Sequence, residues 1–489
     1  MKPRNLSTPW APASGVYSLP GSMMLKLRLG EAPEHVPTQL DVRSRAVAPA
    51  TKIDGGVIDR LIRHYANGAL VTRVHGAAAS LGKRGALHCG FNDEEQISGL
   101  SRTFRLDMDR GSAIERLVAA LSEVSIVEHA SPNFISRAPF SAVVSPPLAI
   151  DMQQAWESRD AMYAREAMAY EPGDPGLIVA IVDSGVSPHH PEMSKRFRSG
   201  FDTVQLGSSD FAPGVTLLGD VAQADTKPID KHVGHGMACA GIIGAIGNGM
   251  PAGLAGDCAL LPIRVLGAAK LPAKTEAVGL GAITDIDMGV KMAVDLGARV
   301  INMSFGTADD ALEPGVPKPH ADVVSYAAAR GCVLVAASGN SGKEEIYWPA
   351  AYENVIAVGS IAAADSKPSH FTTRGSHVAL CAVGERVATC SLDGYQLATG
   401  TSFAAPFVAA AAALIVSRAQ RRSYPVSGRD VRRILTESAT PWPASRQADF
   451  SGYGAGILNV AAALATLDQE IDRSQSADTE LGVLELNDD

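Results

Sequence analysis

Strands that are apolar along their whole length alternate with helical patterns from residue 177 onward, and this alternation constrains the fold more than any other feature. Residues 177–182 form the first such strand. A strand is apolar throughout when both faces of its sheet are covered. The helices and strands that follow it cover residues 285–296, 300–304, 321–329, 332–337 and 355–358. We therefore predict an α/β fold, a mostly parallel sheet with helices on both faces.

Size and composition indicate two globular domains. The chain has 489 residues, of which 46% are hydrophobic and 19% charged, with a net charge of −9. This acidic balance argues against a nucleic-acid partner. The six cysteines lack metal-ligand spacing and are interpreted as structural thiols, although their even number leaves disulfides open. No apolar segment of signal-peptide type begins the sequence, and no run spans a bilayer, so we expect a cytoplasmic protein with no membrane partner; secretion by a non-classical route stays open.

The first part of the chain predicts a separate small domain. Residues 1–20 are rich in Pro, Ser and Gly, which predicts a disordered N-terminus. Residues 21–135 contain two strand–helix–strand units, the order of a ferredoxin-like α+β domain. A proline-rich linker, 136–150, follows it and precedes the α/β domain at 151–466. We expect the acidic residues 467–489 to form a loose tail.

Three polar residues stand where the fold class places chemistry. Asp183 ends the first long strand, His235 begins an apolar helix, and Ser402 lies between Gly400-Thr401 and an alanine-rich helix. Taken singly, these are equally a turn aspartate, a structural histidine and a helix cap. Together they supply the three groups that a serine nucleophile needs: hydroxyl, imidazole base and orienting carboxylate. The order Asp, His, Ser is the order found in subtilisin.

The motifs around these residues resemble the subtilisin family (subtilases) of serine peptidases. They are Val179–Val186, Gly234-His235-Gly236 and Gly400–Pro406, together with Ala337-Ser338-Gly339-Asn340. The resemblance covers roughly 150–465 and implies a subtilisin-like fold with Asp183, His235 and Ser402 as the catalytic triad. It also implies an oxyanion hole formed by the Asn340 side chain and the Ser402 N–H. A self-processing endopeptidase acting on peptides or proteins is the function it implies.

The resemblance further implies which residues hold the substrate and which ligands the protein lacks. Substrate would bind along Gly279, Leu280 and Gly281 as an added strand, and against Ser304, Phe305 and Gly306 beside the primary specificity pocket. We expect no catalytic cofactor and no catalytic metal. A structural calcium near Asn248 is only weakly supported, because that loop has no carboxylate before Asp257. Cys239 is interpreted as a small buried apolar residue. If it lies under His235, as the resemblance implies, a bulky thiol reagent should inhibit.

Residues 21–135 resemble the subtilase propeptide, which inhibits its own enzyme and assists folding. Self-cleavage would then fall between 134 and 150. Two other functions remain open: a dedicated intracellular maturation protease for one peptide or protein, and a catalytically silent binding protein. Substrate preference is also open, because Glu344 and Glu345 either favour a basic residue or are solvated surface charges.

Overall fold

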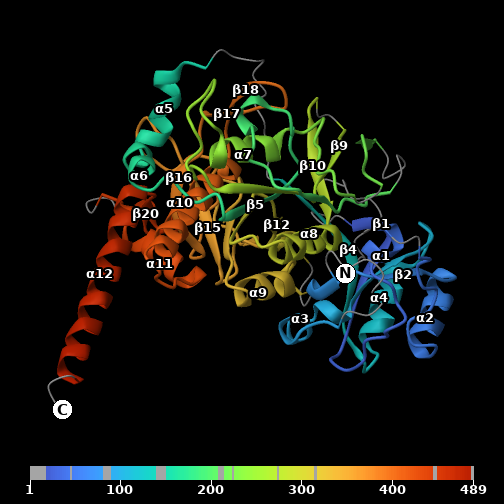
Figure 1. The fold of residues 1–489 in the computed structure, drawn as a ribbon. Coiled ribbons are helices and arrows are strands. Elements are labelled where there is room, and N and C mark those ends of the chain that lie inside the picture. The colour runs from blue at the N-terminus through green and yellow to red at the C-terminus, as the bar shows by residue number, and fades with distance from the viewer. Residues whose placement is uncertain are drawn as a thin grey trace.

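The computed structural model describes residues 18–44, 47–80, 90–138, 150–207, 214–222, 225–272, 275–312, 317–443 and 449–485. Two large sheets organise these residues, and Figure 1 shows them with the N-terminal elements at the lower right and the rest of the chain above and to the left. The larger sheet has nine strands and lies in the C-terminal part. The other has seven strands and is shared between the two parts of the chain.

The nine-stranded sheet confirms the predicted α/β fold. Its neighbouring strands are parallel except at the β19–β20 edge. In spatial order the strands are β19 (Thr440–Pro441), β20 (Gly456–Ile457), β16 (Val378–Val383), β15 (Val355–Ile361), β13 (Val333–Ala337), β11 (Val300–Met303), β5 (Ile178–Asp183), β8 (Ala259–Arg264) and β6 (Phe201–Asp202).

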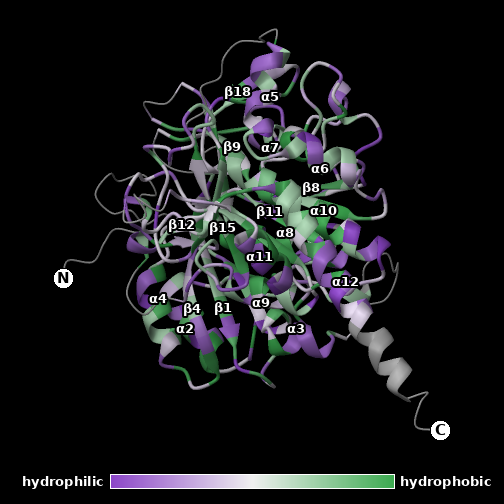
Figure 2. Ribbon diagram, turned by 90° about the vertical axis from the view of Figure 1, so that its left-hand side faces the viewer, coloured by the Kyte–Doolittle hydropathy of each residue, from purple (hydrophilic) through white to green (hydrophobic). Residues whose placement is uncertain are grey.

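Helices cover both faces of this sheet, as the apolar strands predict. Along β5, Val179 and Ile181 pack into one core, while Ala180 and Val182 pack into the other. The first core contains side chains from α7 (His235–Gly244), α10 (Thr401–Arg421), α11 (Gly428–Glu437) and α12 (Val460–Glu485). The second contains side chains from α8 (Ile283–Asp295) and α9 (Ala321–Ala329). Figure 2 shows the hydrophobic residues gathered around these central strands and around α10.

Helix α10 is the centre of the first core. Of the described helices, it alone is long and apolar enough to cross a membrane. Of its most apolar 18-residue stretch, 94% is buried inside the protein. The run of small side chains allows α7 and the strands to approach it closely. Burial on all sides fixes the first turn of α10, which carries Ser402.

The N-terminal part contains the two predicted strand–helix–strand units. The first unit is β1 (Ser18–Leu27), α2 (Val57–Ala66) and β2 (Leu70–Arg73), and the second is β3 (Thr103–Asp107), α4 (Ile114–Ser122) and β4 (Val127–Arg137). Their antiparallel order is β2-β3-β1-β4, and α2 and α4 share one hydrophobic core with them. Short helices α1 (Gln39–Ser44) and α3 (Asp93–Ile97) lie in the connections.

Strand β4 joins the two parts of the chain. Beyond β4 the seven-stranded sheet continues with β10 (Ala277–Ala282), β9 (Gly267–Lys270) and β7 (Thr216–Leu218). Because β4 continues to Arg137, residues 136 and 137 of the predicted linker are part of this sheet. Residues 139–149 of the linker and residues 1–17 of the predicted disordered N-terminus lie outside the described residues, while residues 18–20 begin β1.

The expectation of a loose tail after residue 467 is wrong. Helix α12 continues to Glu485, and Figure 1 shows it extending away from the body of the molecule. Leu464, Leu467 and Ile471 recur at helical spacing and are buried in the first core. Acidic Asp468 faces Arg418 of α10 at 2.9 Å. The acidic composition hid this pattern, because the charges pair with arginines of the neighbouring helices.

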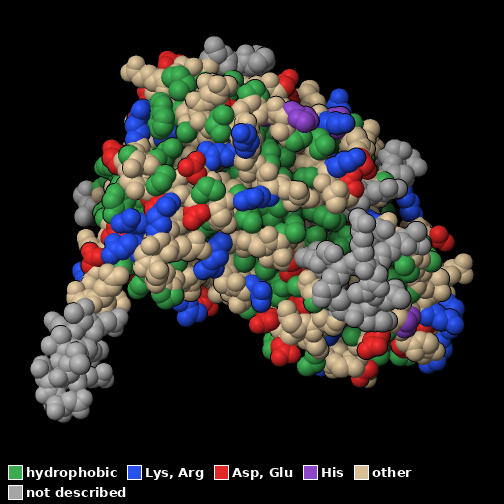
Figure 3. Space-filling view, viewed as in Figure 1, with side chains coloured by type: hydrophobic (Ala, Val, Ile, Leu, Met, Phe, Trp, Pro, Cys, Tyr) green, Lys and Arg blue, Asp and Glu red, His purple; other side chains and the backbone are tan. Residues whose placement is uncertain are grey.

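The remaining elements border the C-terminal part. They are α5 (Met152–Asp160), α6 (Ala164–Tyr170) and two small antiparallel pairs, β12 (Thr307–Ala308) with β14 (Tyr347–Trp348) and β17 (Val387–Cys390) with β18 (Tyr395–Ala398). Five of the six cysteines are described, and all five are buried free thiols. On the face seen in Figure 3, Lys and Arg side chains are interspersed with Asp and Glu.

Candidate active site

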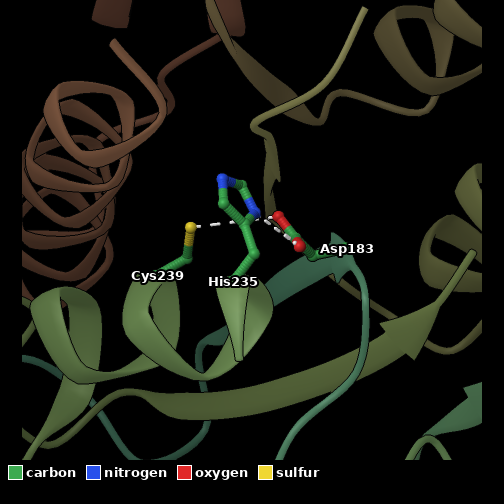
Figure 4. Close-up of side chains that lie close together, drawn as sticks. All are labelled: Asp183, His235 and Cys239. Atoms are coloured by element: carbon green, nitrogen blue, oxygen red, sulfur yellow. Dashed lines mark hydrogen bonds and ion pairs between the residues drawn. The ribbon is translucent and has the colours of Figure 1, made fainter. Parts of the chain in front are cut away.

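Asp183 is the last residue of β5, and its carboxylate accepts hydrogen bonds from neighbouring groups inside the protein. Its side chain is fully buried. One carboxylate oxygen, Oδ1, accepts a hydrogen bond from the backbone N–H of Ser184 at 2.7 Å and lies 2.7 Å from His235 Nδ1. This contact fixes the imidazole with its other nitrogen, Nε2, directed away from Asp183, as Figure 4 shows. The carboxylate therefore orients the imidazole, as the predicted three-residue arrangement requires.

His235 is the first residue of α7, and glycine allows this helix to begin so close to Asp183. A Cβ on Gly236 would lie 2.4 Å from the carbonyl oxygen of Gly185. A glycine at 236 is therefore needed for the turn after β5 to contact α7. The His235 ring also packs against Phe403, with ring centroids 5.3 Å apart.

One supporting residue, Asp230, was missed by the sequence analysis. The carboxylate of Asp230 accepts three backbone N–H groups, those of His232, Val233 and Gly234, just before α7. The carboxylate of Asp230 also accepts a hydrogen bond from the Ser184 hydroxyl at 2.7 Å. The hydroxyl oxygen of Ser184 in turn accepts a hydrogen bond from the N–H of Gly236 at 3.0 Å. Asp230 thereby ties the start of α7 to the end of β5. An acidic residue four positions before Gly234 was the only signal for this role in the sequence.

Ser402 lies in the first turn of α10, and Pro406 determines how its carbonyl is used. Proline has no N–H, so the helical bond from residue 406 back to the carbonyl of Ser402 cannot form. That carbonyl instead accepts the Ser304 hydroxyl at 2.9 Å and the Cys239 thiol at 3.5 Å. These two bonds attach the backbone of Ser402 to the residue that follows β11 and to α7.

The hydroxyl of Ser402 donates to the carbonyl oxygen of Ser304 at 3.4 Å. A hydroxyl has one hydrogen to donate, so donation to an imidazole requires this long bond to break. The three predicted catalytic residues therefore come from β5, α7 and α10, elements that pack together in one core.

Asn340 follows β13, and its amide orientation is fixed by the residue before the nucleophile. Its Oδ1 accepts the N–H of Thr401 at 3.0 Å and the Thr401 hydroxyl at 2.8 Å. Because the oxygen is held in this way, Nδ2 is the end directed away from Thr401. A Cβ on Gly400 would lie 3.3 Å from Nδ2. The amide N–H groups therefore stand beside the nucleophile's turn, where the predicted oxyanion donor belongs.

The predicted substrate-binding residues flank a segment of the chain itself. Leu280, Gly281 and Ala282 of β10 pair antiparallel with residues 135–137 at the end of β4. On the other side, the N–H of Gly306 donates to the carbonyl oxygen of Arg137 at 3.2 Å. The side chain of Phe305 is buried in the second core. Strand β4 therefore pairs with Leu280 and Gly281 of the predicted substrate-binding residues, whereas Gly279 pairs with Ala268 of β9.

Cys239 lies beside the catalytic pair, as the resemblance implies. Its sulfur is 3.9 Å from Asp183 Oδ2, and ligand atoms of Asp183, His235 and Cys239 all lie within 4.8 Å of one another (Figure 4). Burial, and then the charge of Asp183, raise the pKa of the Cys239 thiol well above its ordinary value. The thiol is therefore neutral at physiological pH and is no ready metal ligand.

The loop around Asn248 does not fit a calcium ion. The N–H groups of Gly247, Asn248 and Gly249 all donate to the carboxylate of Glu192, at 2.8, 3.0 and 2.5 Å. The hydroxyl of Tyr395 is a fourth donor to the same carboxylate, at 3.0 Å. Calcium requires oxygen ligands. This loop instead directs backbone N–H groups inward, and the Glu192 carboxylate already accepts them.

The site has the composition and the geometry of a serine hydrolase built on a parallel α/β sheet. An aspartate, a histidine and a serine meet at the carboxyl end of the sheet, with an oriented amide beside the serine. Sequence comparison is specific about the class: residues 174–456 match the Subtilase family, peptidase S8. The chain belongs to the subtilase family and is a subtilisin-like serine endopeptidase.

Individual relatives agree with this assignment. The chain is 31% identical over 331 residues to the thermophilic serine proteinase of Bacillus sp. strain AK1, which covers 67% of this chain and 71% of the relative. It is 32% identical over 289 residues to thermitase of Thermoactinomyces vulgaris, 58% of this chain and 86% of that one. A solved protease structure from Pseudoalteromonas arctica has the same fold, with a TM-score of 0.53 and 23% identity over 66% of this chain and all of that one.

Proposed function

We propose that this endopeptidase is made as a zymogen that cleaves its own chain through an acyl-enzyme. Ser402 Oγ bonds to the carbonyl carbon of the scissile peptide while its proton passes to Nε2 of His235. His235 returns that proton to the leaving amine as the C–N bond breaks. In the second half of the reaction a water molecule attacks the acyl carbon and gives its proton to His235. The bond to Ser402 Oγ then breaks, Ser402 regains its proton from His235, and the new carboxyl end of the peptide is released. Asp183 holds the imidazole through Nδ1 and stabilises its charged form.

The oxyanion of each tetrahedral intermediate is held by Nδ2 of Asn340 and the backbone N–H of Ser402. The fixed orientation of the Asn340 amide supports this role, since a donor aimed in advance needs no rearrangement during reaction. Activity is lost on acidification, because a protonated imidazole cannot accept the hydroxyl proton.

The observation that carries the zymogen proposal is the position of residues 135–137. They lie between β10 and Gly306, the two segments at which substrate is expected to bind. The hydroxyl of Ser136 also contacts that of Thr307 at 2.7 Å. A segment held on both sides in this way occupies the cleft as a product does, and it excludes other substrates. The residues from 18 to 137 are thus proposed to be an inhibitory propeptide.

Charged contacts across the two parts of the chain support inhibition by the whole N-terminal domain. Arg105 meets Asp285 at 2.8 Å, and Lys291 meets Glu95 at 2.6 Å, with all four side chains at most 4% exposed. Asn133 donates to the Thr284 hydroxyl at 3.0 Å. These contacts fix β4 at the entrance of the site, so the domain acts as an intramolecular inhibitor.

Comparing the purified wild-type chain with Ser402→Ala tests the zymogen proposal directly. We expect the wild-type chain to separate into two fragments, with mass spectrometry placing the cut within 136–150. Ser402→Ala is expected to stay intact and to hydrolyse no peptide. Retained hydrolysis in purified Ser402→Ala would refute the mechanism, and an active wild-type chain that is never cut would refute the self-processing step.

A second candidate is a dedicated maturation protease that cuts one partner inside the cell. The likeness to the solved prenylagaramide maturation protease PagA, with a TM-score of 0.50 and 25% identity over 62% of this chain and 98% of that one, favours this candidate. A peptide-library profile distinguishes the two. Cleavage confined to one extended motif indicates a maturation enzyme, whereas cleavage of many sequences indicates a broad endopeptidase.

A further inference from the structure

Two segments that follow neighbouring strands diverge beside the nucleophile. Strands β11 and β13 are paired up to Met303 and Ala336, and the chain then continues as residues 304–306 on one side and 337–340 on the other. In the proposed mechanism the scissile carbonyl lies at Ser402 with its oxygen at Asn340. The side chain of the residue before the scissile bond must then enter the space between these two segments. Whatever fills that space decides which residues the enzyme accepts.

The ring of Tyr347 lies between the two segments and contacts both. Its hydroxyl donates to the carbonyl oxygen of Gly306 at 3.0 Å. A Cβ on Gly306 would lie 2.4 Å from Cε1 of the ring, and a Cβ on Gly339 would lie 3.3 Å from its Cγ. Glycine at both positions is therefore what lets the aromatic ring fit between the walls.

The position of Tyr347 is fixed by its own secondary structure. Strand β14 pairs with β12, which directly follows Gly306, so that Tyr347 lies opposite Ala308. The side chain is 8% exposed. Burial raises the pKa of the Tyr347 phenol far above its ordinary value, so the hydroxyl stays a donor to Gly306 at any working pH. The ring is thus held at both ends and does not swing aside at low cost.

We propose that Tyr347 is the specificity-determining residue that closes the primary pocket, so that the enzyme accepts only Gly, Ala or Ser before the scissile bond. This inference rests on the proposed mechanism and deepens it. A larger side chain has to displace a packed aromatic ring and break its hydrogen bond. Glu345, the alternative determinant for a basic residue, is 3.5 Å from Lys343 and is already paired.

Two chromogenic peptides that differ in one residue test the pocket: N-succinyl-Ala-Ala-Pro-Ala-p-nitroanilide and its Phe counterpart. The self-processed wild-type enzyme is expected to show a kcat/KM for the Ala peptide at least about 100-fold above that for the Phe peptide. Tyr347→Gly is expected to shift this ratio toward Phe by about 100-fold or more. Tyr347→Phe is the matched control: it keeps the ring, and its ratio should stay within about 3-fold of wild type.

Tyr347→Leu provides a second variant, because it keeps an apolar side chain in the core if the glycine variant does not fold. It should move the ratio in the same direction by a smaller factor. Equal cleavage of both peptides by wild type, or an unchanged ratio in a folded Tyr347→Leu protein, overturns the inference alone. Ser402→Ala is assayed in parallel. If wild type hydrolyses neither peptide above that variant, the proposed mechanism fails together with the pocket.

Discussion

The catalytic centre and the interface that covers it are stabilised by different forces. Around Ser402 the core consists of small apolar side chains, and within it the buried Asp183 carboxylate lies 2.7 Å from Nδ1 of His235. Across the interface, ion pairs such as Arg105–Asp285 and Lys291–Glu95 hold the two parts together. Apolar packing does not respond to pH, whereas buried ion pairs do. The difference suggests a centre that is permanent and a covering domain that is built to separate.

Removing one partner of a buried ion pair should have the largest effect on this comparison. In Arg105→Met, the fully buried Asp285 loses its cation, which typically costs about 3–5 kcal/mol. We expect the free energy of opening between β4 and β10 to fall by that amount. Native-state hydrogen exchange of the shared amides, measured on the uncut Ser402→Ala chain, reports this opening.

The double variant Arg105→Met with Asp285→Asn serves as the control for that experiment. It removes the buried carboxylate that Arg105→Met leaves unpaired at Asp285, so most of the lost stability should return. Asp107, which is 35% exposed and 2.9 Å from Arg105, loses that contact in both variants. Equal losses in the single and double variants would mean that packing, and not the ion pair, holds the interface.

A change at the centre should affect chemistry and leave the interface intact. Asn340→Leu removes one oxyanion donor, so kcat is expected to fall by about 100- to 1000-fold, roughly 2.7–4 kcal/mol, with little change in KM. Thr401→Val removes one of the two groups that orient the amide, and about a tenfold loss is expected. Steady-state kinetics on the processed enzyme measures both. A loss in Asn340→Leu that appears only in KM would contradict the assigned role.

Lowering the pH should have a smaller effect, and this effect should be confined to the free energy of opening at the interface. His75 borders a small cavity against α8 together with Lys291, Asp295, Met288 and Met292. Burial, and then the charge of Lys291, lower the pKa of His75 well below its ordinary value of 6.5. A histidine with a lowered pKa is neutral in the closed form and takes up a proton only on opening. Burial of the neutral His75 therefore does not destabilise the closed form above about pH 6.5. As the pH falls below that value, the open form takes up the proton and the closed form loses stability.

For this one proton, opening should become easier by at most about 1.4 kcal/mol per pH unit below pH 6.5. The measurement is the same exchange experiment between pH 5 and 7, corrected for intrinsic exchange rates. In His75→Gln the free energy of opening should change less steeply with pH than in the protein that retains His75. His129, whose pKa burial and then Lys26 lower to about 4, is present in both proteins and cancels in the difference. An unchanged slope in His75→Gln would exclude His75 as the responsible group.

The sequence indicated the proposed centre more directly than its surroundings, and the reason is physical. The proposed catalytic residues Asp183, His235, Ser402 and Asn340 each lie in a contiguous motif at the end of a strand or the start of a helix, so the local pattern was enough to nominate them. Asp230 and Tyr347 contact residues that are distant in sequence, namely Ser184 and Gly306, and only packing reveals these contacts. The helical continuation through Leu467 and Ile471 was missed because its acidic residues are paired with arginines from other helices.

Removing calcium should have the smallest effect of all. Glu192 already accepts the N–H groups of the loop at 247–249. The carbonyl oxygens of Pro251 and Ala252, which follow this loop, accept the guanidinium of Arg159 at 3.5 and 3.2 Å. That side chain is fully buried, and although burial lowers the pKa of Arg159 to about 10, it stays charged at neutral pH. A cation of the chain itself thus occupies the carbonyl-rich side of this loop, and a second cation would be repelled by it.

We therefore expect a chelator such as EDTA to change the melting temperature of the Ser402→Ala chain by less than about 1 °C, which corresponds to well under 1 kcal/mol. Magnesium-saturated EDTA at the same ionic strength controls for screening of the interface ion pairs. A calcium-specific drop of about 5 °C or more would show that a site outside this loop binds the ion. The stability of the centre would then depend on a ligand, and its contrast with the separable interface would no longer hold.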